Sequence, residues 1–306
     1  MTVLVIGNAT VDFSFEVDHL PAPGETLLAH SRLIDAGGKG LNQAVVARRA
    51  GATVVYLAAV GTDANAQVIR HRLAAEGLDD QLLVRDGPTD QSIIYLAPGG
   101  ENMIVSTADR AASLRPADAA LALETLGPRD ALLMQGNLGR ETTRSCLAAG
   151  RRRGARIVLN PAPIAFDYGD LWSCVDVAVV NLVECRGLGG KDDPVEAARR
   201  LIATGAAAVV VTLGKQGALA VTSEAVRAAP APIVAAVDAT GAGDVFCGVL
   251  VAALADGDSL ADAVPSAVAA ASLSVTRRGT SSAFPSAAEL AALRRGARLA
   301  TAGRIA

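Results

Sequence analysis

The sequence has few cysteines, few aromatic residues and little net charge. Its four cysteines, Cys146, Cys174, Cys185 and Cys247, form no CxxC pair, which favours buried reduced thiols over a disulfide framework or a zinc site. A net charge of −3 gives no basic surface for nucleic acid or anionic membranes. No apolar run reaches 18 residues and the first basic residue is Arg32, so neither a membrane span nor a signal peptide is expected. These absences predict a cytoplasmic protein without nucleic-acid or membrane partners.

Short apolar runs alternate with helical patterns along the whole chain. Hydrophobic residues make up 51% of it, which suits helices packed on a buried parallel sheet. The alternation predicts a single α/β domain over residues 1–306, with no internal repeat or long linker. The expected strands are Val3–Gly7, Val54–Val60, Ala131–Gln135, Arg156–Asn160, Val175–Asn181, Ala208–Leu213 and Ala218–Thr222. The expected helices include Leu41–Ala50, Ala64–Glu76, Arg140–Arg153 and Pro194–Thr204.

Two segments, about 12–34 and 89–107, do not follow this alternation of strand and helix patterns. Asp12–Asp18 alternates polar and apolar residues like a half-exposed strand, and Thr26–Arg32 is expected to return beside it. Gln91–Ala97 and Asn102–Thr107 flank Pro98-Gly99-Gly100-Glu101, which indicates a hairpin. Because no helix pattern accompanies them, one face of this small sheet needs other cover. A lid over a ligand cleft or a dimer contact would supply it, and an ordinary peripheral hairpin is the alternative.

The stretch from Val237 to Asp244, VDATGAGD, precedes an apolar helical pattern that runs from Val245 to Leu254. Small residues let the backbone approach a ligand, and the first turn of a helix offers unpaired N–H groups to an anion. Asp244 stands where that turn begins, so its carboxylate is placed to accept a proton from a substrate hydroxyl. A glycine-rich turn with a helix-capping aspartate is the alternative.

Two common phosphate-binding motifs are absent. A Walker A loop needs a glycine five residues before a Gly-Lys pair, but the three Gly-Lys pairs have Leu33, Cys185 and Val209 there. The GxGxxG fingerprint is also missing after the first expected strand, which continues Gly7-Asn8-Ala9. The chain is therefore predicted to be neither a P-loop enzyme nor an NAD-dependent dehydrogenase.

Three further clusters are candidate ligand sites. The glycine-rich stretch from Ala36 to Ala44 (AGGKGLNQA) could bring backbone, lysine and amide groups to a polyol. The stretch Asn181–Glu184 follows a strand, and Glu184 could hold Mg²⁺ through water. The stretch Thr212–Gly217 could hold nucleotide phosphates or simply turn the chain.

In their order and spacing these clusters resemble the ribokinase-like (PfkB) family of carbohydrate kinases, and among its members the ribokinases in particular. The two signatures are GGKGxNQA at residues 37–44 and DATGAGD at residues 238–244. The resemblance covers nearly the whole chain. It implies a three-layer α/β/α sandwich with a mostly parallel central sheet and a small β-sheet lid. It also implies a homodimer joined through the lid.

The resemblance assigns the chemistry as well. It makes Asp244 the general base and Gly241, Ala242 and Gly243 the anion hole for the γ-phosphoryl group of ATP. The implied sugar contacts are Asp12, Gly37, Gly38, Lys39, Asn42 and Asn137, together with Asp244. The implied ATP and Mg²⁺ contacts are Asn181, Glu184, Thr212, Gly214 and Gly217, with Gly241 and Gly243. A site for an activating K⁺ is implied at Asp238, Thr240, Arg277 and Gly279.

Three departures from the ribokinase pattern leave the substrate open. Thr10 stands in place of an asparagine, Gly136-Asn137 stand where ribokinases carry a glutamate, and Ala283 replaces a serine of the cation loop. Such exchanges can change which hydroxyl pattern a site accepts. We therefore predict a kinase for a ribose-like or ketose sugar. A nucleoside kinase, with the small residue 136 and neutral residue 137 admitting a base, and a non-catalytic sugar- or nucleotide-binding regulator are the alternatives.

Overall fold

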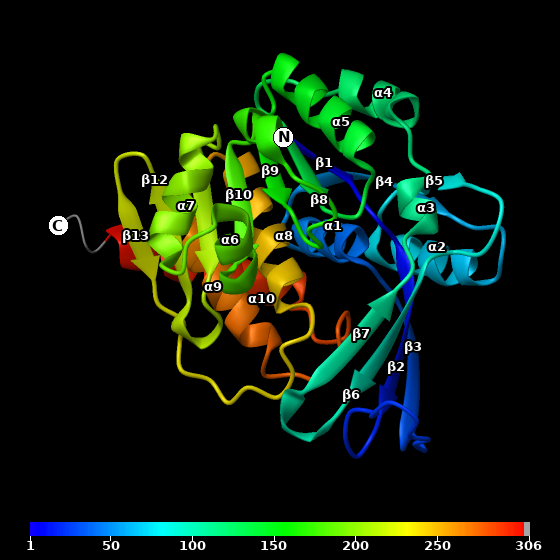
Figure 1. Cartoon of the computed structure of the whole chain (residues 1–306). Coiled ribbons are helices and arrows are strands. Elements are labelled where there is room, and N and C mark those ends of the chain that lie inside the picture. The colour runs from blue at the N-terminus through cyan, green and yellow to red at the C-terminus, as the bar shows by residue number, and fades with distance from the viewer. Residues whose placement is uncertain (303–306) are drawn as a thin grey trace.

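The computed structural model describes residues 1–302 (Figure 1). Its large sheet has nine strands, which run through the middle of the molecule. They are β1 (Thr2–Ile6), β4 (Thr53–Val60), β5 (Gln81–Val84), β8 (Ala131–Gln135), β9 (Arg156–Asn160), β10 (Val177–Asn181), β11 (Ala208–Thr212), β12 (Ala218–Thr222) and β13 (Val226–Ala229). Their order is β13-β12-β11-β10-β9-β8-β1-β4-β5, and all neighbours are parallel except at β12 and β13.

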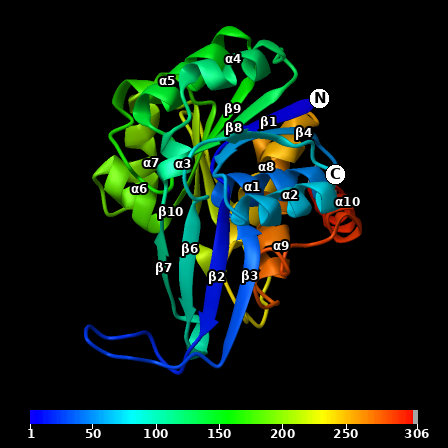
Figure 2. The ribbon, with the colours of Figure 1, turned by 90° about the vertical axis from the view of Figure 1, so that its right-hand side faces the viewer.

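Helices cover both faces of this sheet, as Figure 2 shows edge-on. Successive residues of β1 explain why: Val3 and Val5 belong to one buried cluster, and Leu4 and Ile6 belong to the other. A strand that is apolar on both faces needs helices on both sides. One face carries α1 (Lys39–Arg49), α2 (Asn65–Glu76), α8 (Ala242–Ala255), α9 (Leu260–Ser274) and α10 (Ala287–Ala302). The other carries α3 (Asp109–Ala112), α4 (Pro116–Glu124), α5 (Arg140–Arg152), α6 (Leu182–Gly189) and α7 (Pro194–Ala203).

A separate sheet of four strands projects from the sandwich (Figures 1 and 2). Its order is β3 (Ser31–Gly37), β2 (Thr10–Glu16), β6 (Gln91–Leu96) and β7 (Asn102–Ser106). Every residue of β7 is exposed, with Ile104 at 49% and Val105 at 62% of full exposure. The predicted α/β sandwich with an additional small sheet is therefore confirmed.

One predicted strand is wrong. The return strand expected at Thr26–Arg32 begins only at Ser31, and Glu16 pairs with Ser31 while Thr10 pairs with Gly37. The chain between these strands contains Pro21 and Pro23, which lack the N–H that a sheet ladder needs, so the connection is longer than expected. The sequence pattern also missed the short strands β5 and β13; the other predicted elements lie within three residues of their observed ends.

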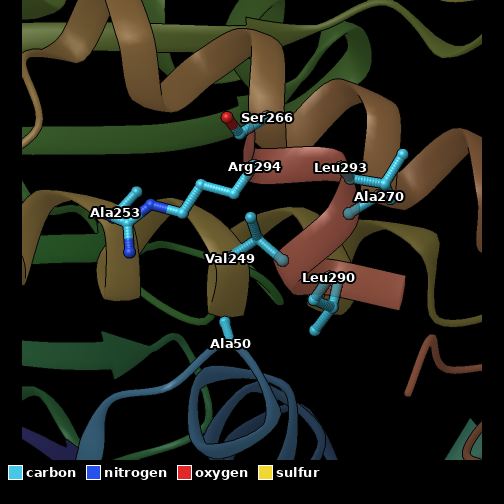
Figure 3. Close-up of a pocket in the computed structure, with 8 residues that line it drawn as sticks. All are labelled: Ala50, Val249, Ala253, Ser266, Ala270, Leu290, Leu293 and Arg294. Carbon is cyan, nitrogen blue, oxygen red and sulfur yellow. The ribbon is translucent and has the colours of Figure 1, made fainter. Parts of the chain in front are cut away.

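A cavity of about 10 Å³ lies in the core beneath α10 and is shown in Figure 3. It is lined by Ala50, Val249, Ala253, Ser266, Ala270, Leu290, Leu293 and Arg294. A space of this size holds at most about one water molecule. Hence the side of α8 that packs against α9 and α10 is structural. Within residues 1–302 we find no helix that is both long and apolar enough to cross a membrane.

Candidate active site

The two glycine-rich signatures meet at the carboxylate of Asp244. Asp244 lies in the first turn of α8, after Gly241 with φ 77°, and is 6% exposed. Asn42 donates from Nδ2 to Asp244 Oδ2 at 3.0 Å, and Gln43 donates from Nε2 to Oδ1 at 2.9 Å. Both donors come from α1, which packs directly against α8. Segments about 200 residues apart thus form a single site.

Lys39 supplies a positive charge to this site. Its Nζ lies 4.0 Å from Asp244 Oδ1, and the carboxylate raises the pKa of Lys39. The ammonium group therefore stays charged beside the carboxylate. Its side chain remains 39% exposed, so it can also reach a ligand in the cleft.

The small sheet brings a second carboxylate to the same region. Asp12 on β2 is buried, accepts a hydrogen bond from Thr10 Oγ1 at 2.7 Å, and faces the backbone of Gly37, where a Cβ would lie 2.0 Å from Asp12 Oδ2. Burial raises the pKa of Asp12, and hydrogen bonds from Thr10 and Ser92 oppose this shift. The negative charge of Asp244 adds to the rise in the pKa of Asp12, so the two carboxylates interact electrostatically.

Backbone N–H groups at the start of α8 form a candidate anion site. Asp244 N–H donates to Gly241 O at 3.0 Å, and Ala242 N–H donates to Ala239 O at 3.3 Å. Among residues 1–302, no partner accepts from the N–H groups of Gly241 and Gly243. A Cβ built on Gly243 would meet nothing within 4 Å, so the space beside it is open. Unpaired donors beside open space at a helix N-terminus suit a phosphoryl group.

The proposed nucleotide residues lie at the carboxyl ends of neighbouring strands. Asn181 of β10 pairs with Thr212 of β11, and ligands of open α/β sheets bind at this end. Asn181 and Glu184 form a capping box: Glu184 N–H donates to Asn181 Oδ1 at 2.8 Å, and Asn181 N–H donates to Glu184 Oε2 at 2.9 Å. The charge of Glu184 also raises the pKa of Lys39, which places Glu184 within electrostatic reach of the site.

The glycines that follow β11 belong to the turn before β12. Gly214 begins this turn, the short helix η3 (Gly214–Gln216), and Gly217 ends it. A Cβ on Gly217 would lie 2.0 Å from Ala229 O, so close packing requires this glycine whether or not a nucleotide binds.

Asp238 ties together the two loops of the expected cation site. Its Oδ1 accepts from Thr240 N–H at 2.9 Å and its Oδ2 accepts from Gly279 N–H at 3.0 Å. Thr240 Oγ1 is buried and has no hydrogen-bond partner within residues 1–302, so an oxygen is available there. The guanidinium of Arg277 instead pairs with Glu289, which leaves only the main chain of Arg277 for a cation.

A cavity of about 520 Å³ lies between these loops and the small sheet. Ser14, Glu16 and Leu33 line it from the sheet, and Asp238 and Thr240 line it from the loops. Two contacts beside it join the small sheet to the 277–282 loop. Ser281 Oγ donates to Asp35 Oδ2, and Arg278 Nη1 lies 3.6 Å from Glu16 Oε1. The small sheet is thus joined to the 277–282 loop and encloses a space large enough for a small ligand.

Residues 136 and 137 do not open the site in the way expected. A Cβ on Gly136 would lie 2.0 Å from Pro163 O, so the side of Gly136 that lacks a side chain is filled by backbone. Packing against this backbone therefore accounts for the glycine at 136 without a base. Asn137 Oδ1 is buried without a partner among the described residues, which leaves an acceptor for a ligand donor.

We expect Gly136→Ala to destabilise the fold. The added methyl group must displace the backbone at Pro163, and such overpacking typically costs about 1–3 kcal/mol. Denaturant unfolding of both proteins measures this cost. Gly139→Ala is the matched control, because a Cβ there would meet nothing within 4 Å. Equal unfolding free energies for Gly136→Ala and the control would contradict the close approach.

Sequence reasoning missed the amides behind Asp244. Gln43 contacts Asp244 directly, and Gln135 and Asn160 contact Gln43. A signal was present, since Gln135 and Asn160 are polar residues that each follow three or more apolar residues at the end of a strand. Their convergence depends on the strand order, which the pattern alone does not give.

Comparison with known proteins places this site in a family. Residues 2–287 match the model described as pfkB family carbohydrate kinase. The chain is 31% identical over 295 residues to the ribokinase of Haemophilus influenzae and 32% identical over 296 residues to the deoxyribokinase of Salmonella typhi, covering 94% of this chain and 96% of each relative. The crystal structure of Thermotoga maritima ribokinase matches with a TM-score of 0.88 at 30% identity, over 96% of this chain and 99% of that chain. The chain therefore belongs to the pfkB family of carbohydrate kinases, phosphotransferases with an alcohol group as acceptor.

Proposed function

We propose that this kinase transfers the γ-phosphoryl group of Mg-ATP to a primary hydroxyl of a ribose-like or ketose sugar, with Asp244 as general base. One observation carries the proposal. The Asp244 carboxylate is held by two amide donors at a helix N-terminus, next to unpaired backbone N–H groups and open space. A base and an anion site at one helix turn are what phosphoryl transfer to a hydroxyl needs.

In the reaction the sugar oxygen attacks the γ-phosphorus as the bond to the bridging oxygen of ADP breaks. The proton of the hydroxyl passes to Asp244 and is later released to solvent. The N–H groups of Gly241 and Gly243 and the ammonium of Lys39 oppose the negative charge on the transferred group. Positioning and charge stabilisation of this kind account for most catalysis of phosphoryl transfer.

The nucleotide is assigned to the β10–β11 side of the site, near Asn181, Glu184, Thr212, Gly214 and Gly217. Within residues 1–302 no group of three or more His, Cys, Asp and Glu side chains could hold a metal ion. A Mg²⁺ with one protein carboxylate, Glu184 acting through water, and the phosphates as its main ligands fits this donor set. When bound, Mg²⁺ would neutralise phosphate charge.

A monovalent cation, K⁺, is assigned to the loops joined by Asp238. The buried unpartnered Oγ1 of Thr240 supports this assignment, because such an oxygen is costly without a ligand. Gly279 and Arg277 would contribute through their main chains. The cation would reinforce the positive potential at the start of α8.

The sugar is assigned to the cleft between Asp12, Gly37, Gly38, Asn42 and Asn137. Thr10 already occupies Asp12 Oδ1, so the site can lose one sugar hydroxyl without leaving that oxygen unpaired. This observation, with the 32% identity to a deoxyribokinase, makes a 2-deoxypentose the second candidate. A nucleoside is less favoured because backbone fills the space beside Gly136.

We further propose that the small sheet, with segments 12–34 and 89–107, is the lid of a single kinase domain and the contact of a homodimer. The exposed apolar side chains of β7 support this, since an unshielded strand of this kind needs cover.

A cytoplasmic location is supported by the thiols. Burial raises the pKa of Cys146 to about 12 and that of Cys185 to about 11, as expected for inert reduced cysteines.

A substrate panel tests the proposed function. We expect ADP release from Mg-ATP to depend on a pentose or ketose and to rise with K⁺. Comparing ribose, 2-deoxyribose, fructose and a nucleoside under equal conditions separates the candidates. ADP release only with the nucleoside would contradict the sugar assignment, and release with none of them would favour the regulatory alternative.

A further inference from the structure

Behind Asp244 lies a chain of buried side-chain amides. Gln43 and Gln135 are 0% exposed and Asn160 is 8% exposed. Gln43 comes from α1, while Gln135 and Asn160 end the neighbouring strands β8 and β9. Glutamine and asparagine side chains are mostly exposed in proteins, so the burial of three of them together needs a reason.

The hydrogen bonds among these three amides, and from them to Asp244 and Val179, each have a defined donor and acceptor. Gln43 Nε2 donates to Asp244 Oδ1 at 2.9 Å and to Asn160 Oδ1 at 3.2 Å. Gln43 Oε1 accepts from Gln135 Nε2 at 2.9 Å, and Asn160 Nδ2 donates to Val179 O at 2.9 Å. The main-chain carbonyl of Val179 can only accept, so it fixes the orientation of Asn160 and, through it, that of Gln43.

This direction matters for Asp244. If the amide of Gln43 were reversed, its Oε1 would face Asp244 Oδ1 and Asn160 Oδ1. Both contacts would become repulsive. Asn160 therefore keeps an N–H of Gln43 directed at Asp244, and Gln135 donates to the Gln43 Oε1 that this orientation presents to it.

These three amides include one unfavourable feature, which a purely stabilising role does not explain. Gln135 Oε1 is buried without a hydrogen-bond partner among the described residues. A buried acceptor of this kind disfavours folding. An apolar side chain of similar volume would remove this acceptor but would also remove the donor to Gln43 Oε1. The amide at 135 is thus better explained by its effect on Gln43 than by packing.

We propose that Gln43 is a positioning residue for Asp244 and that Gln135 and Asn160 set its orientation. The proposal rests on the proposed role of Asp244 as the base. It assigns a catalytic effect to Gln135, whose side chain makes no hydrogen bond to Asp244 or to the anion site at the start of α8 within residues 1–302.

The test is Gln135→Met, which removes the donor to Gln43 and keeps the apolar volume. We expect kcat to fall about tenfold, because small misplacements of reacting groups have effects of at least this size. KM for sugar and ATP should change less than about twofold. The melting temperature should change little, because removal of the unpaired Gln135 Oε1 is offset by the loss of the donor to Gln43 Oε1. A merely structural role predicts a lower melting temperature with unchanged kcat.

Thr143→Val is the matched control. Thr143 on α5 is fully buried and its Oγ1 also lacks a partner within residues 1–302, but it is not bonded to the amide chain. We expect its melting temperature to stay equal or rise while kcat does not change. The double variant Gln43→Met with Gln135→Met should lose no more kcat than Gln43→Met alone, because Gln135 acts through Gln43.

The outcomes separate this inference from the proposed function. Wild-type kcat in Gln135→Met, or additive losses in the double variant, would overturn the inference even if Asp244→Asn is inactive. Near-normal turnover in Asp244→Asn would instead overturn the proposed base.

Discussion

Asp244→Asn is expected to lower kcat by about a thousandfold or more, within the upper range of effects for loss of a general base. The asparagine keeps the shape of the side chain but cannot accept the hydroxyl proton. ATP affinity should change little, because most contacts proposed for the nucleotide lie on β10, α6 and the β11–β12 turn. Those at the start of α8 are main-chain N–H groups, which the substitution keeps. Turnover measured with saturating sugar, and ATP binding measured by calorimetry, give the two quantities.

The control for this variant must lose the same charge elsewhere. Asp170→Asn serves, because Asp170 is an exposed carboxylate paired with Arg140 of α5, a helix on the opposite face of the sheet from α8. We expect its kcat to equal that of the wild type. If Asp244→Asn also retained more than about a tenth of wild-type turnover, another group would have to be the base.

Gly243→Ala is expected to lower kcat by about a hundredfold while leaving the fold intact. The glycine lies in the first turn of α8 with open space where a Cβ would stand. In a helix alanine is favoured over glycine by about 1 kcal/mol, so the free energy of unfolding should not fall. The methyl group would instead occupy space proposed for the γ-phosphoryl group, and loss of one oxyanion contact costs about 10²–10³ in kcat.

Gly296→Ala is the control for helix propensity. Gly296 lies within α10, and a Cβ there would also meet nothing within 4 Å. Both variants should therefore show equal or higher stability in denaturant unfolding. Only Gly243→Ala should lose activity, and full activity in that variant would mean that the phosphoryl group lies elsewhere.

Local patterns in the sequence predicted the layers of the fold well. The apolar runs that became β1, β8, β9 and β11 are short and bounded by turn residues, so their period and length are informative. The return strand of the small sheet failed because its register depends on a long connection rather than on a tight turn. The edge strands β5 and β13 have only four residues each, too few for a clear pattern.

The candidate site was predictable where a motif is contiguous and obscure where it depends on packing. Gly241, Gly243 and Asp244 follow one another in the chain, whereas Gln43, Gln135 and Asn160 meet only because β8 and β9 are neighbours beneath α1. Glu184 shows a third case. Asn181 and Glu184 have capping-box spacing, so the same two residues serve the helix and remain candidates for the metal.

The most direct test of the central claim is identification of the product formed from ribose and Mg-ATP. Phosphorus NMR of the reaction mixture distinguishes a phosphate ester on the primary hydroxyl from one at the anomeric carbon. We expect the primary ester with wild-type protein, formed in equal amount to ADP, and none with Asp244→Asn. Transfer to the anomeric oxygen, or equal product from both proteins, would contradict it.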